Sequence, residues 1–226
     1  MIKLENVTKI FPNHTTALDK ISFEIKTGGF VFITGPSGAG KTTLLRLILR
    51  EILPTSGSIF VNNQDIVKIP PSKVYELRRK IGVVFQDFKL LNDRSVFENI
   101  ALSLEVLDKS KNEIDKEVLE ILHLTGLEEQ AYLFPSQLAG GEAQRTVIAR
   151  AVVGHPEYLL ADEPTGNLDP KTSWKIVKIL KEVQDIGTTV IMATHNVDIV
   201  NSLTERVILL QKGKLIKDEK KGRYKT

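Results

Sequence analysis

The stretch of residues 30–42, FVFITGPSGAGKT, joins an apolar run, a glycine-rich turn and a Lys-Thr pair. Residues 35–42 fit the pattern G-x4-G-K-[ST], and residues 43–49 have the spacing of a helix. A strand that passes through this pattern into a helix is the context in which the pattern forms a phosphate-binding loop. The residues expected to line the loop are Gly35, Pro36, Ser37, Gly38, Ala39, Gly40, Lys41, Thr42 and Thr43.

The residue types in this loop suit the phosphates of a nucleotide. Glycines let backbone amides close around phosphates where a Cβ atom would clash. Lys41 would reach the terminal phosphates, and the hydroxyl of Thr42 would be a ligand of Mg²⁺. The loop by itself leaves a purely structural glycine-rich turn open as an alternative.

Two stretches further along the chain carry chemistry that complements the loop. Residues 136–145, SQLAGGEAQR, predict a turn that opens a helix, whose unpaired backbone N–H groups can hold an anion. Residues 158–164, YLLADEP, predict a buried strand that ends in two carboxylates, Asp162 and Glu163. One carboxylate suits Mg²⁺, and its neighbour suits a water that must be activated. The three stretches together predict hydrolysis of a nucleoside triphosphate and argue against the structural turn.

Length and composition bound the possible classes of protein. A chain of 226 residues with 42% hydrophobic and 26% charged residues is long enough for one large globular domain. No apolar run approaches the ~18 residues of a spanning helix, and residues 1–5 do not begin a secretory signal, so we expect the cytoplasmic side of a membrane. The absence of cysteine excludes disulfides, thiolate zinc sites and a thiol nucleophile. A net charge of +3 is too small to indicate a nucleic-acid partner.

The apolar runs predict an α/β fold with a parallel core sheet. Strands are expected at residues 30–34, 81–85, 158–161 and 189–193, because these runs suit strands buried on both faces. Ligands collect at the carboxyl ends of such strands, and these four runs end at the phosphate loop, Gln86, Asp162 and Thr194-His195.

The rest of the chain predicts an antiparallel β part and a helical lobe. Short apolar runs at residues 2–7, 21–25 and 58–61 favour antiparallel strands, and residues 206–216 favour a closing hairpin that turns at Lys212-Gly213. Helical spacing is found at residues 96–107, 112–122 and 141–153. We therefore expect one domain, in which residues 1–95 and 155–226 form the core with its antiparallel part and residues 96–154 form an inserted helical lobe.

In this order, the motifs resemble those of the ATP-binding-cassette (ABC) ATPase family over essentially the whole chain. The correspondence places Walker A at residues 35–42, the Q-loop at Gln86, the signature at 138–142, Walker B at 158–162, the catalytic Glu163, the D-loop at 167–169 and the switch His195. Within the family the chain is most similar to ATPases of bacterial cell division, through residues 34–41, 85–96 and 161–169. The pair Asp93-Arg94 weighs most in that choice. The resemblance implies the P-loop NTPase fold of ABC ATPases and Mg²⁺-dependent hydrolysis of ATP.

The resemblance also implies a role for single residues. Phe11 would stack on adenine, and Asp162 would hold Mg²⁺ through water. Glu163 would polarise the attacking water, and His195 would stabilise the charge that develops on the γ-phosphate. Gln86 would contact both the metal and the γ-phosphate.

In the family, the signature serves the nucleotide of the opposite subunit, so the resemblance implies an ATP-dependent homodimer. The signature residues expected at that nucleotide are Ala139, Gly140, Gly141 and Glu142. Ala139 departs from the family pattern, which has a serine whose hydroxyl meets the γ-phosphate. We therefore expect a weakened site that still works, because the backbone amides and the helix N-terminus remain.

The resemblance finally implies a peripheral protein at the cytoplasmic face of the bacterial inner membrane, bound to an integral membrane permease that controls cell-wall hydrolysis. The expected dock for that partner is the segment 86–100, with Gln86, Phe88 and Val96 near its surface. The alternatives are the ATPase of a lipoprotein-release or macrolide-type exporter, a soluble ABC protein of DNA repair or translation, and a regulator with degenerate catalysis. Soluble ABC proteins carry long coiled-coil insertions or two cassettes, and a degenerate regulator would not keep both Glu163 and His195.

Overall fold

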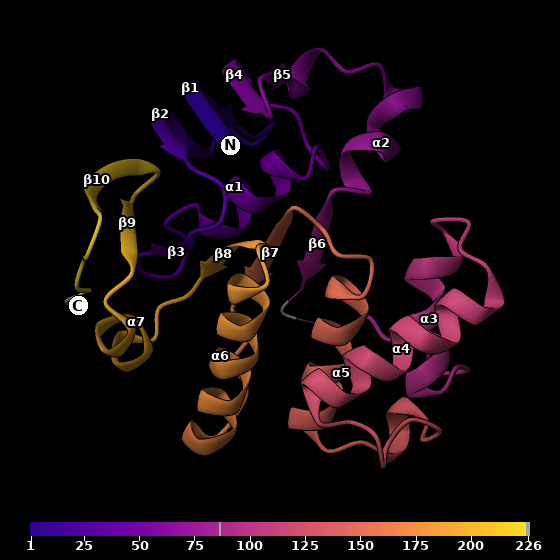
Figure 1. Ribbon diagram of the computed structural model, residues 1–226. Coiled ribbons are helices and arrows are strands. Elements are labelled where there is room, and N and C mark those ends of the chain that lie inside the picture. Colours follow the sequence, from indigo (N-terminus) through magenta and orange to yellow (C-terminus); the bar gives the residue numbers. More distant parts are fainter. Residues whose placement is uncertain (86, 225–226) are drawn as a thin grey trace.

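The computed structural model describes residues 1–85 and 87–224, which form two sheets and the helices around them (Figure 1). The six-stranded core sheet has the order β10-β9-β3-β8-β7-β6, and the four-stranded sheet has the order β2-β1-β4-β5. The core strands are β3 (Phe30–Thr34), β6 (Ile81–Val84), β7 (Tyr158–Asp162), β8 (Thr189–Ala193), β9 (Arg206–Gln211) and β10 (Lys214–Glu219). The second sheet holds β1 (Ile2–Ile10), β2 (Thr16–Ile25), β4 (Ser56–Val61) and β5 (Gln64–Asp65). The helices are α1 (Lys41–Ile48), α2 (Val74–Arg78), α3 (Val96–Glu105), α4 (Lys111–Thr125), α5 (Gly140–Val152), α6 (Pro170–Asp185) and α7 (Val197–Leu203).

The parallel core predicted from the apolar runs is confirmed. β3 pairs in parallel with β8, β8 with β7, and β7 with β6, and every residue of β3, β7 and β8 is buried. Successive side chains of a strand point to opposite faces, so Phe32 packs into the apolar cluster shared with α5 and α6. Its neighbours Val31 and Ile33 pack into the second cluster, which contains α1 and the four-stranded sheet.

The last hairpin turns where the sequence predicts, at Lys212 and Gly213, whose φ angles are 47° and 76°. Two successive positive φ angles suit the tight turn of a hairpin. The strand β9 also pairs in parallel with β3, so the hairpin extends the core sheet as its edge. The sequence pattern alone does not reveal this pairing, because it joins residues far apart in the chain.

The two N-terminal strands are longer than the apolar runs predict. β1 extends to Ile10 and β2 begins at Thr16, and their pairing is interrupted by three register shifts. Positive φ angles at Asn6 and Lys20 fall within these strands. Each irregularity shifts the alternation of buried and exposed residues, which hides the outer parts of both strands from a period-2 pattern.

Helices α3, α4 and α5 lie between β6 and β7 in the chain and gather on one side of the molecule, away from the β9–β10 hairpin (Figure 1). Both α3 and α4 begin with a capping box, Ser95 with Glu98 and Ser110 with Glu113. Gly126, with φ of 62°, ends α4 three residues beyond the predicted limit.

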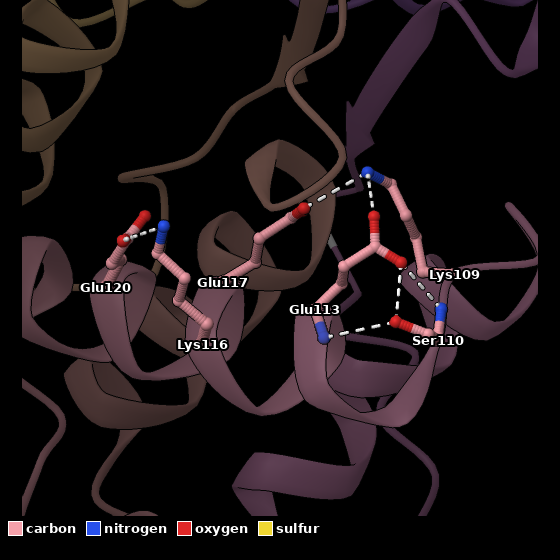
Figure 2. Close-up of polar contacts among 6 residues, drawn as sticks. All are labelled: Lys109, Ser110, Glu113, Lys116, Glu117 and Glu120. Carbon is pink, nitrogen blue, oxygen red and sulfur yellow. Dashed lines mark hydrogen bonds and ion pairs between the residues drawn. The ribbon is translucent and has the colours of Figure 1, made fainter.

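The exposed face of α4 carries a row of charges (Figure 2). Lys109 Nζ lies 3.4 Å from Glu113 Oε1 and 3.2 Å from Glu117 Oε1. Hydrogen bonds from Ser110, followed by those from Lys109, lower the pKa of Glu113 to about 2. Exposed pairs of this kind contribute little to stability, so we assign the row to solvation of the helix. None of the helices in the described residues combines the length and the apolar character that crossing a bilayer requires.

Candidate functional site

The glycine-rich loop connects β3 to α1, and two of its glycines are required by the protein's own packing. A Cβ atom on Gly35 would clash with the carbonyl oxygen of Leu210, and one on Gly40 would lie 2.5 Å from that of Ala17. Both also have positive φ, 143° and 104°. Gly38 has φ of 75° and open space around its Cα. Sequence reasoning assigned all the glycines to phosphate approach, whereas only Gly38 is free of this intramolecular constraint.

The side chain of Lys41 points back into the loop that precedes it. Its Nζ donates to the carbonyl oxygens of Gly35 at 2.8 Å and Pro36 at 3.4 Å, and it lies 3.4 Å from Glu163 Oε1. Lys41 is buried, so the pair with Glu163 is shielded from water and is stronger than a surface pair. The loop therefore places a cation beside the carboxylate that ends β7.

Glu163 lies at the centre of the group. Its N–H donates to the carbonyl oxygen of Ala193 on β8 at 2.9 Å, and its φ is 46°. A positive φ is uncommon for a glutamate and aims this side chain away from the line of the strand. Its Oε1 lies 2.9 Å from Nδ1 of His195, which follows β8. The ends of β3, β7 and β8 thus bring Lys41, Glu163 and His195 together.

Asp162 precedes Glu163 and faces a different set of neighbours. It is 8% exposed, and its Oδ1 has no hydrogen-bond partner among the described residues. Burial raises the pKa of Asp162, and the hydrogen bond from the Thr42 side chain acts in the opposite direction. A buried carboxylate oxygen without a partner is costly, and a cation next to it would remove that cost. Asp162 and Thr42 offer the oxygen ligands that Mg²⁺ prefers.

The signature residues form a separate group at the start of α5. Ala139 is the N-cap and has no side-chain acceptor, so only the carboxylate of Glu142 returns to the helix start, accepting from the N–H of Ala139 at 2.8 Å. A Cβ atom on Gly141 would lie 2.5 Å from the Thr172 side chain on α6. Within the described residues, no hydrogen bond links residues 139–142 to the phosphate loop. Sequence reasoning missed Thr172, because its contact with Gly141 is visible only in the packing of α5 on α6.

Four other predicted residues, Phe11, Gln86, Phe88 and Val96, have different outcomes. Phe11 lies half-buried after β1, and Lys9 Nζ lies 5.3 Å from the centroid of its ring. Gln86 lies outside the described residues. The expectation that Val96 lies near the surface is wrong, because this first residue of α3 is completely buried in the core. Phe88 is half-buried against the same core, and Leu91 is 38% exposed.

A groove runs between the core and the helices α3 and α5. Its volume is about 670 Å³. The residues that line it include Val74, Tyr75, Phe85, Leu102, Val106 and Arg150. Tyr75 and Val106 are 53% and 59% exposed, so the groove presents apolar side chains to its surroundings. The predicted dock, segment 86–100, is a different surface, because none of its described residues, 87–100, lines this groove.

Comparisons with known proteins agree with this geometry. A family model described as ABC transporter matches residues 18–166. The cell division ATP-binding protein FtsE of Bacillus subtilis is 50% identical over 224 residues, which cover 99% of this chain and 98% of that protein. FtsE of Mycobacterium tuberculosis is 47% identical over 225 residues, with 99% and 98% covered. A dimeric ATP-binding cassette, solved in a post-hydrolysis state with ADP and phosphate, has a TM-score of 0.89 at 38% identity, covering 99% of this chain and 100% of that one.

The two FtsE proteins and the solved cassette match 99% of the chain, which includes the phosphate loop, the signature and the strand ends. The ABC ATPase fold inferred from the motifs is confirmed, as are ATP binding and ATP hydrolysis as the activity. The long coverage of both FtsE proteins also confirms the similarity to cell-division ATPases predicted from residues 34–41, 85–96 and 161–169. The chain therefore belongs to the ABC transporter family of ATP-binding cassettes, in the group of the cell-division ATP-binding proteins FtsE.

Proposed function

We propose that two copies of this chain close on ATP and thereby act on an FtsX-like permease that controls cell-wall hydrolysis across the bacterial inner membrane. The chain would lie at the cytoplasmic face as a peripheral subunit. The full-length similarity to FtsE proteins supports the cell-division role. The observation that carries the catalytic part is the Glu163 carboxylate held between Lys41 and His195.

In the proposed reaction, Glu163 accepts a proton from water as that water attacks the γ-phosphorus. The bond from the γ-phosphorus to its bridging oxygen breaks, and ADP leaves with phosphate as the second product. Lys41 would neutralise charge on the terminal phosphates, and His195 would contact the γ-phosphate as negative charge moves onto its oxygens. His195 is exposed, so it can reach a substrate above the strand ends.

Mg²⁺ fits the residues beside this group. The buried Oδ1 of Asp162, which has no partner among the described residues, supports a cation there, and the Thr42 side chain lies next to it. We include Gln86 as a third ligand by family resemblance. Among the described residues there is no group of three or more His, Cys, Asp or Glu that could hold a metal alone. The nucleotide and water would therefore supply most ligands, and the bound ion would neutralise phosphate charge.

The second half of each site would come from the other copy. Because the signature group stands apart from the phosphate loop in one chain, we propose that Ala139, Gly140, Gly141 and Glu142 meet the γ-phosphate of the nucleotide on the partner copy. The N-terminus of the 13-residue α5 would attract that anion. Phe11 would stack on the adenine from the chain that supplies the phosphate loop.

The groove would receive the membrane partner. It lies between the proposed core, residues 1–95 and 155–226, and the proposed helical lobe, residues 96–154. Its lining is mostly apolar, with Arg78, Arg79 and Arg150 among the lining residues, and the apolar part suits the apolar face of a short helix. A partner segment in this position would touch both parts at once and would sense a change in their relative placement.

Affinity purification from membranes tests the proposal. The wild-type protein should recover one integral permease, identified by mass spectrometry. Val106→Asp should reduce that recovery at least about fivefold while ATP binding persists, because a charge in an apolar interface is costly. Leu119→Asp is the matched control, since Leu119 is equally exposed at 59% but lies on α4. A lipoprotein or drug exporter recovered instead would favour the exporter alternative, and equal recovery with Val106→Asp would refute the groove.

A further inference from the structure

A partly buried arginine joins the signature helix to residues 87–95, the segment that follows Phe85 of the groove lining. Arg150 lies near the end of α5, and its Nη1 donates to the carbonyl oxygen of Lys89 at 2.9 Å. Its Nη2 donates to the carbonyl oxygen of Phe88 at 3.2 Å, and Nη1 also lies 3.5 Å from Asn99 Oδ1. Within the described residues these guanidinium partners are all uncharged oxygens. Burial lowers the pKa of Arg150, which reflects its removal from water.

Asn99 holds the other end of the same segment. This residue of α3 is completely buried, and its Nδ2 donates to the carbonyl oxygens of Leu91, Arg94 and Ser95 at 3.1, 3.0 and 2.9 Å. Its Oδ1 accepts from the N–H of Leu91 at 2.9 Å. We call residues 87–95 the groove segment, and Arg150 with Asn99 the clamp. The clamp fixes a stretch that has no helix or strand of its own.

The position of Arg150 connects three parts of the molecule. Its side chain lines the groove, its guanidinium holds the groove segment, and its backbone belongs to the helix that begins at the signature. Its carbonyl oxygen also accepts from Ser103 Oγ on α3 at 2.8 Å. A helix rises about 1.5 Å per residue, so the clamp lies roughly 15 Å from the signature along one stiff element.

We propose that Arg150 is a positioning residue that makes the groove segment and the signature helix move as one unit. A guanidinium that spans two neighbouring carbonyl oxygens fixes direction as well as distance, which a single ammonium cannot do. An event at the signature is therefore transmitted to the groove wall, and an event in the groove is transmitted to the signature. The groove direction of this coupling rests on the proposed membrane partner, whereas the signature direction rests on the proposed ATP-driven dimer and needs no permease.

Hydrogen exchange of backbone amides tests the coupling in the isolated protein. The measured quantity is the exchange rate of the amides in the groove segment, above all that of Leu91. It is compared with and without the Mg²⁺ complex of the non-hydrolysable analogue AMPPNP. In the wild type, the analogue should change exchange in the groove segment at least about threefold. Arg150→Gln should accelerate exchange there about tenfold or more, since a lost hydrogen bond to a charged group has an effect of this order. The same variant should abolish the response to the analogue.

Two further variants separate positioning from simple support of the fold. Arg150→Lys keeps the charge and loses the two-carbonyl contact, so it should fold normally and still lose more than half of the response. Arg145→Gln is the matched control, because Arg145 lies on the same helix but donates to Gly126 at 3.5 Å, outside the groove segment. It should keep the wild-type response. Affinity for the analogue, measured by titration, checks that each variant retains its nucleotide site.

Two results of the exchange experiment would overturn the inference. A wild-type response that survives in both Arg150→Gln and Arg150→Lys would show that the signal bypasses Arg150. A wild-type groove segment that does not respond to the analogue, where light scattering shows the dimer, would show that the segment and the signature helix are independent. Failure to recover a membrane permease would instead refute the proposed function and would leave this exchange result standing. If the permease stimulates wild-type ATP turnover, Arg150→Lys should lose at least half of that stimulation.

Discussion

The strand-end group (Lys41, Glu163 and His195) and the signature group (residues 139–142) are built in opposite ways. At the strand ends, Lys41 and His195 both contact Glu163, within 3.4 and 2.9 Å. At the start of α5, Ala139 and Gly140 are exposed, and only Glu142 folds back onto the helix end. Folding of one chain completes the first group, whereas the second offers an open anion site to the outside. We infer that catalysis is prepared within each chain and completed by a second copy.

The largest loss of ATP turnover is expected from a change at Glu163, the centre of the strand-end group. Glu163→Gln keeps the shape but removes the base and the charge paired with Lys41, so ATP turnover should fall about 10²- to 10⁴-fold. ATP should still bind, and the trapped nucleotide should favour the dimer, measured by light scattering with saturating Mg-ATP. Glu182→Gln, a change at a partly exposed residue of α6, should keep both turnover and oligomeric state. A Glu163→Gln protein that remains monomeric and turns over normally would contradict the division between the two groups.

Lys41→Ala tests the same group at its phosphate side. Lys41 is buried among loop carbonyls, and loss of this cation should weaken ATP binding by roughly 10²-fold in an equilibrium titration. Lys178→Ala removes a largely exposed cation on α6 and should leave the affinity unchanged. Wild-type affinity in the Lys41 variant would rule out the phosphate-loop assignment.

The comparison also separates what the sequence could predict from what it could not. The strand-end residues follow apolar runs directly, so the parallel sheet and the meeting of Lys41, Glu163 and His195 at one edge can be predicted from spacing. The requirement for glycine at positions 35 and 40 could not be predicted in this way, because the carbonyl groups that exclude a Cβ atom belong to distant segments.

Contacts between distant residues were also hidden from the sequence around Arg150 and α3. Arg150 and Lys89 are 61 positions apart, and no local pattern marks a partly buried arginine that binds backbone carbonyls. Val96 was expected near the surface as part of the dock for the membrane partner, yet capping by Ser95 starts α3 there and turns Val96 into the core. Motif spacing therefore identified the chemistry, whereas the contacts that position it depend on the tertiary fold.

The signature group should be improved by one hydroxyl. Ala139→Ser would supply the missing N-cap acceptor for α5 and, in the proposed dimer, a hydrogen bond to the γ-phosphate. ATP-driven dimerisation or turnover should rise about threefold to tenfold. Thermal unfolding without nucleotide measures the cap alone, so a gain confined to that measurement would separate the two effects. If dimerisation and turnover both change by less than about twofold, the loop does not reach the γ-phosphate or another group replaces the serine.

The smallest expected effect is a change in thermal stability that depends on the buried carboxyl of Asp162. Burial raises the pKa of Asp162 above its ordinary value of 3.8, so the native state holds this proton more tightly than the unfolded state does. The stabilisation linked to Asp162 is therefore present at low pH and is lost as the pH rises from about 4 through the raised pKa. At pH 7 without nucleotide or metal, Asp162→Asn should unfold about 2–4 °C higher than the wild type, because the amide carries no buried charge.

The difference in unfolding temperature between Asp162→Asn and the wild type should shrink as the pH approaches 4, where the wild-type carboxyl is protonated. Mg²⁺ with AMPPNP should then reverse the order, stabilising the wild type more than Asp162→Asn, since only the carboxylate can serve the metal fully. Asp198→Asn, an exposed change on α7, is the control and should shift neither curve. An Asp162→Asn protein that is less stable at pH 7 would mean that the buried carboxylate is already satisfied within the fold, and the case for a metal at this position would fail.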